Sequence, residues 1–108
     1  MVQDSVFTYV ESMPSFPGGN DSLRVFLEKN LVYPAASKAK GISGTVYVSF
    51  VIEKDGSISE VQILRGVNQE LDAEVIRILS IMPKWIPGMQ NGNSERVKMT
   101  LPVKFVPG

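Results

Sequence analysis

The spacing of apolar residues predicts three helices. The first begins near Asn20 and has one apolar face, made of Leu23, Phe26, Leu27 and Leu31. A second, short helix fits between Pro34, which suits a first helical position, and Gly41, which suits the left-handed residue after a helix end. The third is capped by Asn68 and stopped by Pro83, and its apolar face consists of Leu71, Val75, Ile78, Leu79 and Met82.

Between the second and third helices the apolar period changes to two, which indicates a strand with one buried face. Val46, Val48, Phe50 and Ile52 alternate there with Thr45, Tyr47, Ser49 and Val51. The pair Asp55-Gly56 signals a tight hairpin turn, and the return strand runs from Ile58 to Leu64. In the return strand Ile58 has an even number, whereas Val61 and Ile63 have odd numbers, so a regular strand would place them on opposite faces. One extra residue near Ser59-Glu60 would put all three on the core face. We therefore predict a β-bulge there.

The last strand is expected from about Glu95 to Phe105. Val97, Met99, Leu101, Val103 and Phe105 alternate with the outward residues Arg96, Lys98, Thr100 and Lys104. The predicted fold is α+β: two short N-terminal helices, then β-β-α-β, with a three-stranded antiparallel sheet covered by helices on one face. The right-handed crossover rule places the last strand beside the first. Residues 1–19 are read as an extended N-terminal arm and residues 20–108 as the domain.

Composition narrows the range of functions. The 108 residues suit one domain. Eleven acidic residues balance eleven basic ones, so the net charge gives no indication of nucleic-acid binding. Cys and His are absent, which excludes the usual zinc ligand sets and the Ser-His and Cys-His nucleophiles. The carboxylates are explained by turns and helix N-termini. We therefore expect no enzyme, no catalytic residue, no cofactor and no metal.

One local feature leaves alternatives open. Trp85, between Pro83 and Pro87, could be a core residue or a peptide-docking platform, and its position after a helix stop favours the core.

No apolar run is long enough to span a bilayer, and Met1 to Asp4 lack the features of a signal peptide. Composition therefore leaves open a cytoplasmic protein or a fragment of a longer chain.

The ordered set of motifs resembles the TonB C-terminal domain family, over roughly residues 9 to 106. None of the motifs is specific by itself, but their order and spacing are. They are Tyr33-Pro34, Gly41-Ile42, Gly44-Thr45-Val46, Asp55-Gly56, Trp85-x-Pro87-Gly88 and Pro102-Val103-Lys104-Phe105. The upstream run from Glu11 to Gly19 looks like the lead-in of one subgroup of that family.

The resemblance implies a non-catalytic periplasmic binding domain. Such domains capture the TonB-box segment of outer-membrane transporters by β-strand addition. They transmit force from an inner-membrane proton-driven motor, for active uptake, through an N-terminal part that this sequence lacks. The resemblance therefore implies inner-membrane anchoring of the full-length protein. The alternative is the same module as the C-terminal tail of a membrane-bound sensor or peptidase, where it binds other envelope segments.

Pro102 predicts where such a partner would bind. Proline has no N–H and is tolerated in a strand chiefly where that group would face solvent, so the last strand should be a sheet edge. We expect its free ladder to cover about residues 96–100. The predicted partner-binding residues are Arg96, Val97, Lys98, Met99, Thr100 and Leu101. An open edge also favours a monomer at low concentration that tends to dimerise through edges.

Overall fold

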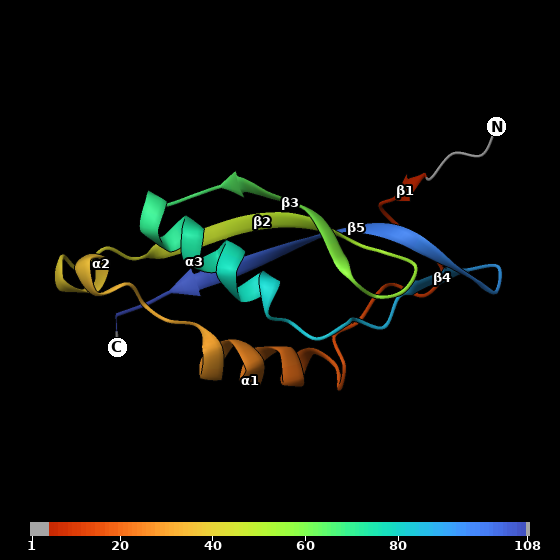
Figure 1. Ribbon diagram of the computed structural model, residues 1–108, viewed down its shortest axis with the longest axis horizontal. Helices are drawn as coiled ribbons and strands as arrows, with labels where there is room; N and C mark the ends of the chain where they lie inside the picture. The colour runs from red at the N-terminus through yellow and green to blue at the C-terminus, as the bar shows by residue number, and fades with distance from the viewer. Residues whose placement is uncertain (1–4, 108) are drawn as a thin grey trace.

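The computed structural model describes residues 5–107. Within them, eight elements follow one another along the chain (Figure 1). They are β1 (Val6–Phe7), α1 (Asn20–Asn30), α2 (Ala35–Ala39), β2 (Gly44–Ile52), β3 (Ile58–Arg65), α3 (Gln69–Ser80), β4 (Gly88–Gln90) and β5 (Asn93–Phe105).

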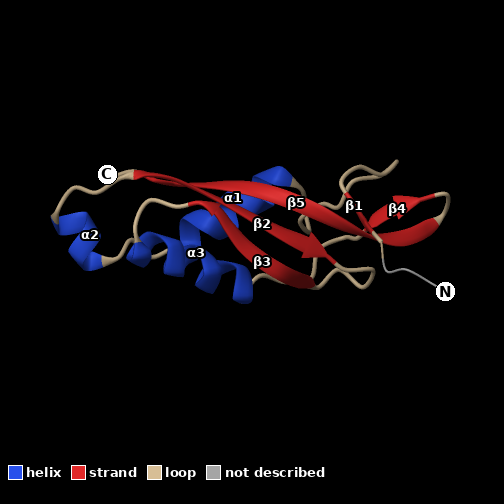
Figure 2. Cartoon of the chain, turned by 90° about the horizontal axis from the view of Figure 1, so that it is seen from above, coloured by secondary structure: helices blue, strands red, loops and turns tan. Residues whose placement is uncertain are grey.

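The strands form one curled sheet in the order β1-β5-β2-β3, and the short β4 pairs with β5. β2 is central and antiparallel to both neighbours, with Gly44 opposite Phe105 and Ile52 opposite Val97 on the β5 side. α1 and α3 lie on the same face of the sheet, α1 beneath β5 and α3 beneath β2 and β3 (Figures 1 and 2). The predicted α+β class is confirmed, as is the position of the last strand beside the first. The sheet has five strands and not the predicted three, because the short β1 and β4 also pair with β5, and β1 does so in parallel.

The core lies between this face of the sheet and the helices. The alternating apolar residues of β2 are fully buried, and α3 covers them with the face that its spacing predicted. Ser49 and Val51, expected on the solvent side, are buried as well. Both belong to the central strand, where β3 and β5 flank them on both sides. Central position in a sheet therefore adds burial that alternation alone does not predict.

The bulge in β3 is confirmed. Ser49 pairs with Gln62 and Val51 with Ser59, so the three residues 49–51 of β2 lie opposite the four residues 59–62 of β3. The extra residue is accommodated at Glu60, whose φ of 48° is left-handed. A second register shift lies opposite Tyr47 and Val48.

The helix ends follow the sequence in part. The Asn68 side chain accepts a hydrogen bond from the Leu71 amide at 2.8 Å, so the predicted cap of α3 is confirmed. Asn20, in contrast, is the first residue of α1 and not its cap. Gly19 precedes the helix with φ 90°, a conformation that glycine adopts without steric cost, and no side chain caps the helix.

A short hairpin precedes the main part of the last strand. β4 and β5 are joined at Asn91-Gly92, with φ 51° and 79° at the two residues. Asn-Gly is the strongest short hairpin signal, because both residues accept the positive φ that such a turn requires. The last strand therefore begins at Asn93, two residues before the expected start.

The described part of the N-terminal arm lies against this hairpin. Ser12 exchanges two backbone hydrogen bonds with Met89, and Ser15 exchanges two with Ile86. Val10 and Phe16 are buried. The boundary at residue 19 stays a prediction, and residues 1–4 and 108 lie outside the described residues.

Trp85 is a core residue, as favoured from sequence. Its ring is 6% exposed and contacts Phe16 edge-to-face and Phe50 at a tilt, both at 5.6 Å between ring centroids. Its amide donates to the Gly56 carbonyl at 2.8 Å. A Cβ at residue 56 would lie 2.0 Å from the Trp85 carbonyl oxygen, so the Asp55-Gly56 turn needs glycine to pack here. Trp85 thus joins the arm, the β2–β3 hairpin and the core.

Glu74 ties α3 to the end of α1. Its buried carboxylate accepts the Val32 amide at 2.6 Å and binds Arg77 at 2.7 and 2.8 Å, while Arg77 donates to the Asn30 carbonyl at 2.8 Å. The hydrogen bonds from Arg77, opposed by burial, lower the pKa of Glu74.

Glu74→Gln should reduce the free energy of unfolding by about 1–3 kcal/mol at pH 7, because a hydrogen-bonded charge pair is lost in a buried place. Folding lowers the pKa of Glu74, so its contribution is present above the ordinary value of 4.5 and is lost as the pH falls through the folded pKa. Urea unfolding should show a smaller difference between variant and wild type at pH 3 than at pH 7.

Glu28→Gln is the matched control. Glu28 pairs with Arg24 at 3.3 Å, and the two side chains are 64% and 62% exposed, so its loss should cost less than about 0.5 kcal/mol. A Glu74→Gln variant that loses the same stability at both pH values would show that packing, and not charge, matters at this position.

Candidate partner-binding edge

β5 has an edge without a neighbouring strand over most of its length. β2 pairs with one side of β5 from Val97 to Phe105. On the other side, β1 pairs only at Arg96 and Val97. Among residues 5–107, no strand pairs with that side from Lys98 to Phe105. We call this stretch the open edge.

The unpaired main-chain groups were predicted at residues 96–100, and the structure places them at residues 98–105 instead. Arg96 and Val97 are covered by β1, while the open edge extends past Pro102 to Phe105. Residues 1–19 were predicted only as an extended arm, because a strand of two residues carries no sequence signal for its pairing partner.

Pro102 fits an edge position. The register between β2 and β5 runs without a shift through the pair Tyr47–Pro102. Such continuity is expected if the proline nitrogen faces the open side, because a proline turned toward β2 would interrupt the ladder. Amides alternate in direction along an antiparallel strand, so those of Lys98, Thr100 and Lys104 would share the side of Pro102.

The side chains at the six predicted positions fall into two groups. Val97 is buried, and Met99 and Leu101 pack against the core. Lys98 and Thr100 are exposed. The sixth, Arg96, is turned across the sheet.

Arg96 is engaged within the domain. Its guanidinium binds Glu53 at 2.7 Å and Glu60 at 2.5 Å, and its side chain is 15% exposed. The hydrogen bonds that Arg96 donates to these carboxylates, to Glu53 foremost, raise the pKa of Arg96, and the bond from Arg96 lowers the pKa of Glu53. This charge therefore joins β5 to β3 across β2. Lys98 and Lys104 are the exposed cations of β5.

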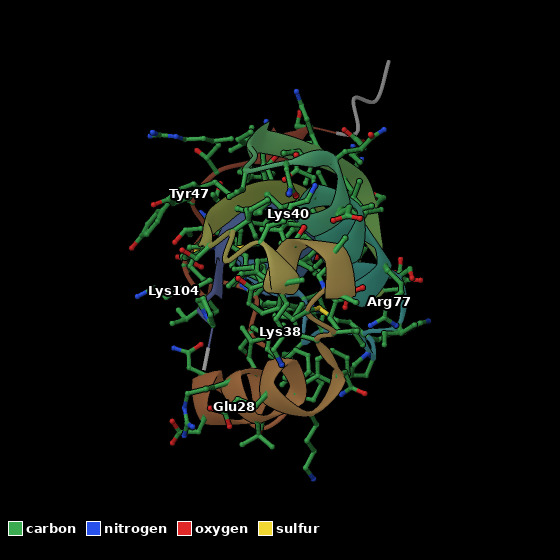
Figure 3. All side chains as sticks on the ribbon, turned by 90° about the vertical axis from the view of Figure 1, so that its left-hand side faces the viewer. Glu28, Lys38, Lys40, Tyr47, Arg77 and Lys104 are labelled. Carbon is green, nitrogen blue, oxygen red and sulfur yellow. The ribbon has the colours of Figure 1, made fainter. Side chains whose placement is uncertain are left out.

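An apolar hollow lies beside the open edge. It measures about 610 Å³ between α1 and the second half of β5. The lining includes Leu23, Leu27, Leu31, Leu101 and Val103, with Arg24, Glu28 and Lys104 among the charged residues. Lys104 and Glu28 lie on the same side of the molecule, opposite Arg77 (Figure 3). A strand added to β5 would extend the sheet over this hollow, where alternate side chains could enter.

The opposite edge of the sheet is formed by β3 and is less suited to strand addition. Two register shifts interrupt it, and Glu60 has a left-handed conformation. Bulges twist an edge away from regular pairing and protect it from other chains. β5 is therefore the edge on which a partner strand can form a regular ladder.

The acidic side chains of the described residues do not cluster. In residues 5–107, no three acidic side chains converge as a metal site would require. The side chain and amide of Ser57 hold the pKa of Asp55 down to about 2, so this exposed carboxylate stays ionised and cannot serve as a general acid near neutral pH. No helix among the described residues has the length and apolar character to span a membrane.

Comparisons with known proteins agree with this geometry. The family model described as the C-terminal domain of the Gram-negative bacterial TonB protein matches residues 29–107, more than half of the chain. Protein TonB of Pseudomonas aeruginosa is 39% identical over 54 residues, which is 50% of this chain and 15% of that relative. The chain therefore spans a small part of the length of this curated relative.

Two solved structures share the fold. The solution structure of the Pseudomonas aeruginosa TonB C-terminal domain matches with a TM-score of 0.50 and 30% identity, over 68% of this chain and 77% of that one. A Helicobacter pylori TonB C-terminal domain matches with a TM-score of 0.61 and 21% identity, over 83% of this chain and 85% of that one. The second likeness concerns the fold alone.

Proposed function

Because the chain belongs to the C-terminal domain family of Gram-negative TonB proteins, a family involved in TonB-dependent transport, we propose that it binds the TonB-box segment of outer-membrane transporters. The segment would add as a strand to β5. The observation that carries this proposal is the open edge from Lys98 to Phe105, with an apolar hollow beneath it. Main-chain hydrogen bonds would supply affinity, and side chains entering the hollow would supply selectivity.

The proposed setting is the periplasm. A longer protein would anchor the domain in the inner membrane and connect it to a proton-driven motor. The domain would then transmit force to the captured segment. Strand addition would couple the two proteins through a ladder of main-chain hydrogen bonds.

A peptide titration tests the proposal. Peptides from the N-termini of outer-membrane transporters of the same organism are added to the isotope-labelled protein, and amide exchange is followed along β5. In the free protein, Lys98 and Thr100 should exchange fast and Met99 slowly, and a bound peptide should slow the fast pair. Protection of all of these amides without peptide would contradict an open edge. Binding of other envelope peptides only would favour the sensor or peptidase setting.

Lys98→Ala should weaken peptide binding by less than about fivefold, since one exposed charge contributes roughly 0.2–1 kcal/mol. The effect should be larger at low salt than at high salt, because exposed charges are screened. Calorimetric titrations at two salt concentrations measure it. Lys84→Ala, which removes an exposed cation remote from the open edge and paired with Asp55, should leave affinity unchanged.

Self-association is expected through the same edge. An unpaired strand edge can pair with that of a second copy, so the protein should be monomeric when dilute and form dimers at higher concentration. Light scattering over a concentration series checks this. A dimer that persists at all concentrations and survives edge substitutions would assign the contact to another surface.

A further inference from the structure

The arm covers one end of the edge proposed to bind the partner. β1 runs parallel to β5, with Val6 opposite Arg96 and Phe7 opposite Val97. β2 already occupies the other side of β5 at Val97. β1 therefore lies on the same side as the open edge, in line with the row of main-chain groups that continues from Lys98.

β1 is held by few contacts. It is two residues long, Val6 is 38% exposed, and the next apolar residue of the arm, Tyr9, is 77% exposed. A strand of two residues, of which Val6 is exposed and Phe7 half-buried, opens at little cost, as the least stable parts of a domain do.

The chain behind β1 is fixed separately. Val10 is 1% exposed, the Glu11 amide donates to the Gln90 side chain at 2.8 Å, and the Glu11 side chain accepts from the Asn91 amide at 2.8 Å. Ser12 then pairs with Met89. Residues 5–9 can therefore leave β5 while Val10 and the rest of the arm stay in place.

We propose that β1 acts as a displaceable strand that covers Arg96 and Val97 and limits how far a partner strand extends along β5. The inference rests on the proposed function, because it concerns the same edge. A segment confined to the open edge binds without moving the arm. A segment that reaches Arg96 and Val97 competes with β1, and the arm thereby lowers the affinity for longer segments.

The free protein gives the first test. In the double variant Val6→Pro/Phe7→Pro, two main-chain donors of the arm are lost, so β1 cannot form its ladder. By the alternation described above, the Arg96 amide faces β1. Its exchange should be about three- to tenfold slower in the wild type than in the variant, while Met99 exchanges slowly in both. Equal exchange of Arg96 in the two proteins would overturn the proposal without any partner being present.

Peptides give the second test. Two synthetic peptides from one transporter N-terminus are compared, a short one that protects only amides of the open edge and the same peptide extended at both ends. The double variant should bind the extended peptide about three- to tenfold more tightly than the wild type, which corresponds to an edge that is uncovered roughly a third to a tenth of the time. Both proteins should bind the short peptide equally.

Tyr9→Ala is the matched control, because Tyr9 lies in the arm but outside β1, and it should change neither peptide's affinity. Equal affinity of both proteins for the extended peptide would overturn the displaceable strand. The wild type and the double variant could bind neither peptide and still differ in the exchange of the Arg96 amide. In that case the proposed function fails, but β1 is shown to cover Arg96. The two failures are therefore distinguishable.

Discussion

Thr100→Pro should abolish peptide binding while leaving the domain folded. Thr100 is exposed and lies in the middle of the open edge, opposite Ser49. Its amide is expected on the side of Pro102, so a proline there removes a donor that only a partner strand uses. A strand partner would meet two prolines in succession along one edge and lose regular pairing on both sides of Leu101. Calorimetric titration should show no measurable binding, and thermal melting should stay within a few degrees of the wild type.

Two variants control this result. Thr100→Val keeps the amide and the β-branched shape, and should bind as the wild type does. Leu101→Pro places the missing amide on the side that pairs with β2, and should cost about 3 kcal/mol or more in stability. If Thr100→Pro binds peptide normally, partners do not add to this edge. If Thr100→Pro unfolds the domain as Leu101→Pro does, the Thr100 amide pairs with β2 and does not face the open edge.

Trp85→Ala should reduce the free energy of unfolding by about 3–5 kcal/mol, the usual range for removal of a buried aromatic ring. The ring fills the space between Phe16 of the arm and Phe50 of β2. Its removal leaves a cavity where the arm, the hairpin turn at Gly56 and the core meet. For a domain of this size the melting temperature should fall by more than about 10 °C.

Trp85→Phe separates ring packing from the indole N–H. Trp85 Nε1 is one of two buried side-chain polar atoms without a hydrogen-bond partner in residues 5–107. The phenylalanine variant loses no hydrogen bond and keeps part of the ring volume, so it should lose clearly less stability than alanine. Tyr9→Ala, at a largely exposed aromatic residue, should change stability by less than about 0.5 kcal/mol. An alanine variant at residue 85 that melts with the wild type would place Trp85 on the surface.

The sequence contained most of the fold because periodicity reports which side of an element is buried. The even residues of β2 and the stripe of α3 had to face one core, and that requirement located three helices and the three main strands. The change of parity between Ile58 and Val61 even located the bulge, since an extra residue was needed to keep apolar side chains on one face. The hairpin at Asn91-Gly92 could have been predicted from the same sequence, because its turn chemistry is explicit.

The candidate site could be predicted only in outline. Pro102 indicated an edge strand because the missing N–H is a property of the residue itself. The extent of the open edge was not predictable, since it depends on where β1 pairs, and two β-prone residues fit any unpaired strand equally well. The hollow beside the edge depends on how α1 lies beneath β5, which no local pattern specifies.

The charged residues of β5 likewise show what the sequence could predict and what only the tertiary structure decides. Arg96 and Lys98 look alike in an alternating strand, and both were expected to face a partner. The tertiary structure separates them, because Glu53 and Glu60 come within hydrogen-bond distance of Arg96 only when the β2–β3 hairpin lies beside β5. The sequence by itself determined which face of each main helix and strand meets the core and that the last strand is an edge, through side-chain polarity and the absent proline N–H. Only the tertiary structure decided which part of that edge is open, because strand neighbours and ion pairs far apart in the chain are chosen by the assembled sheet.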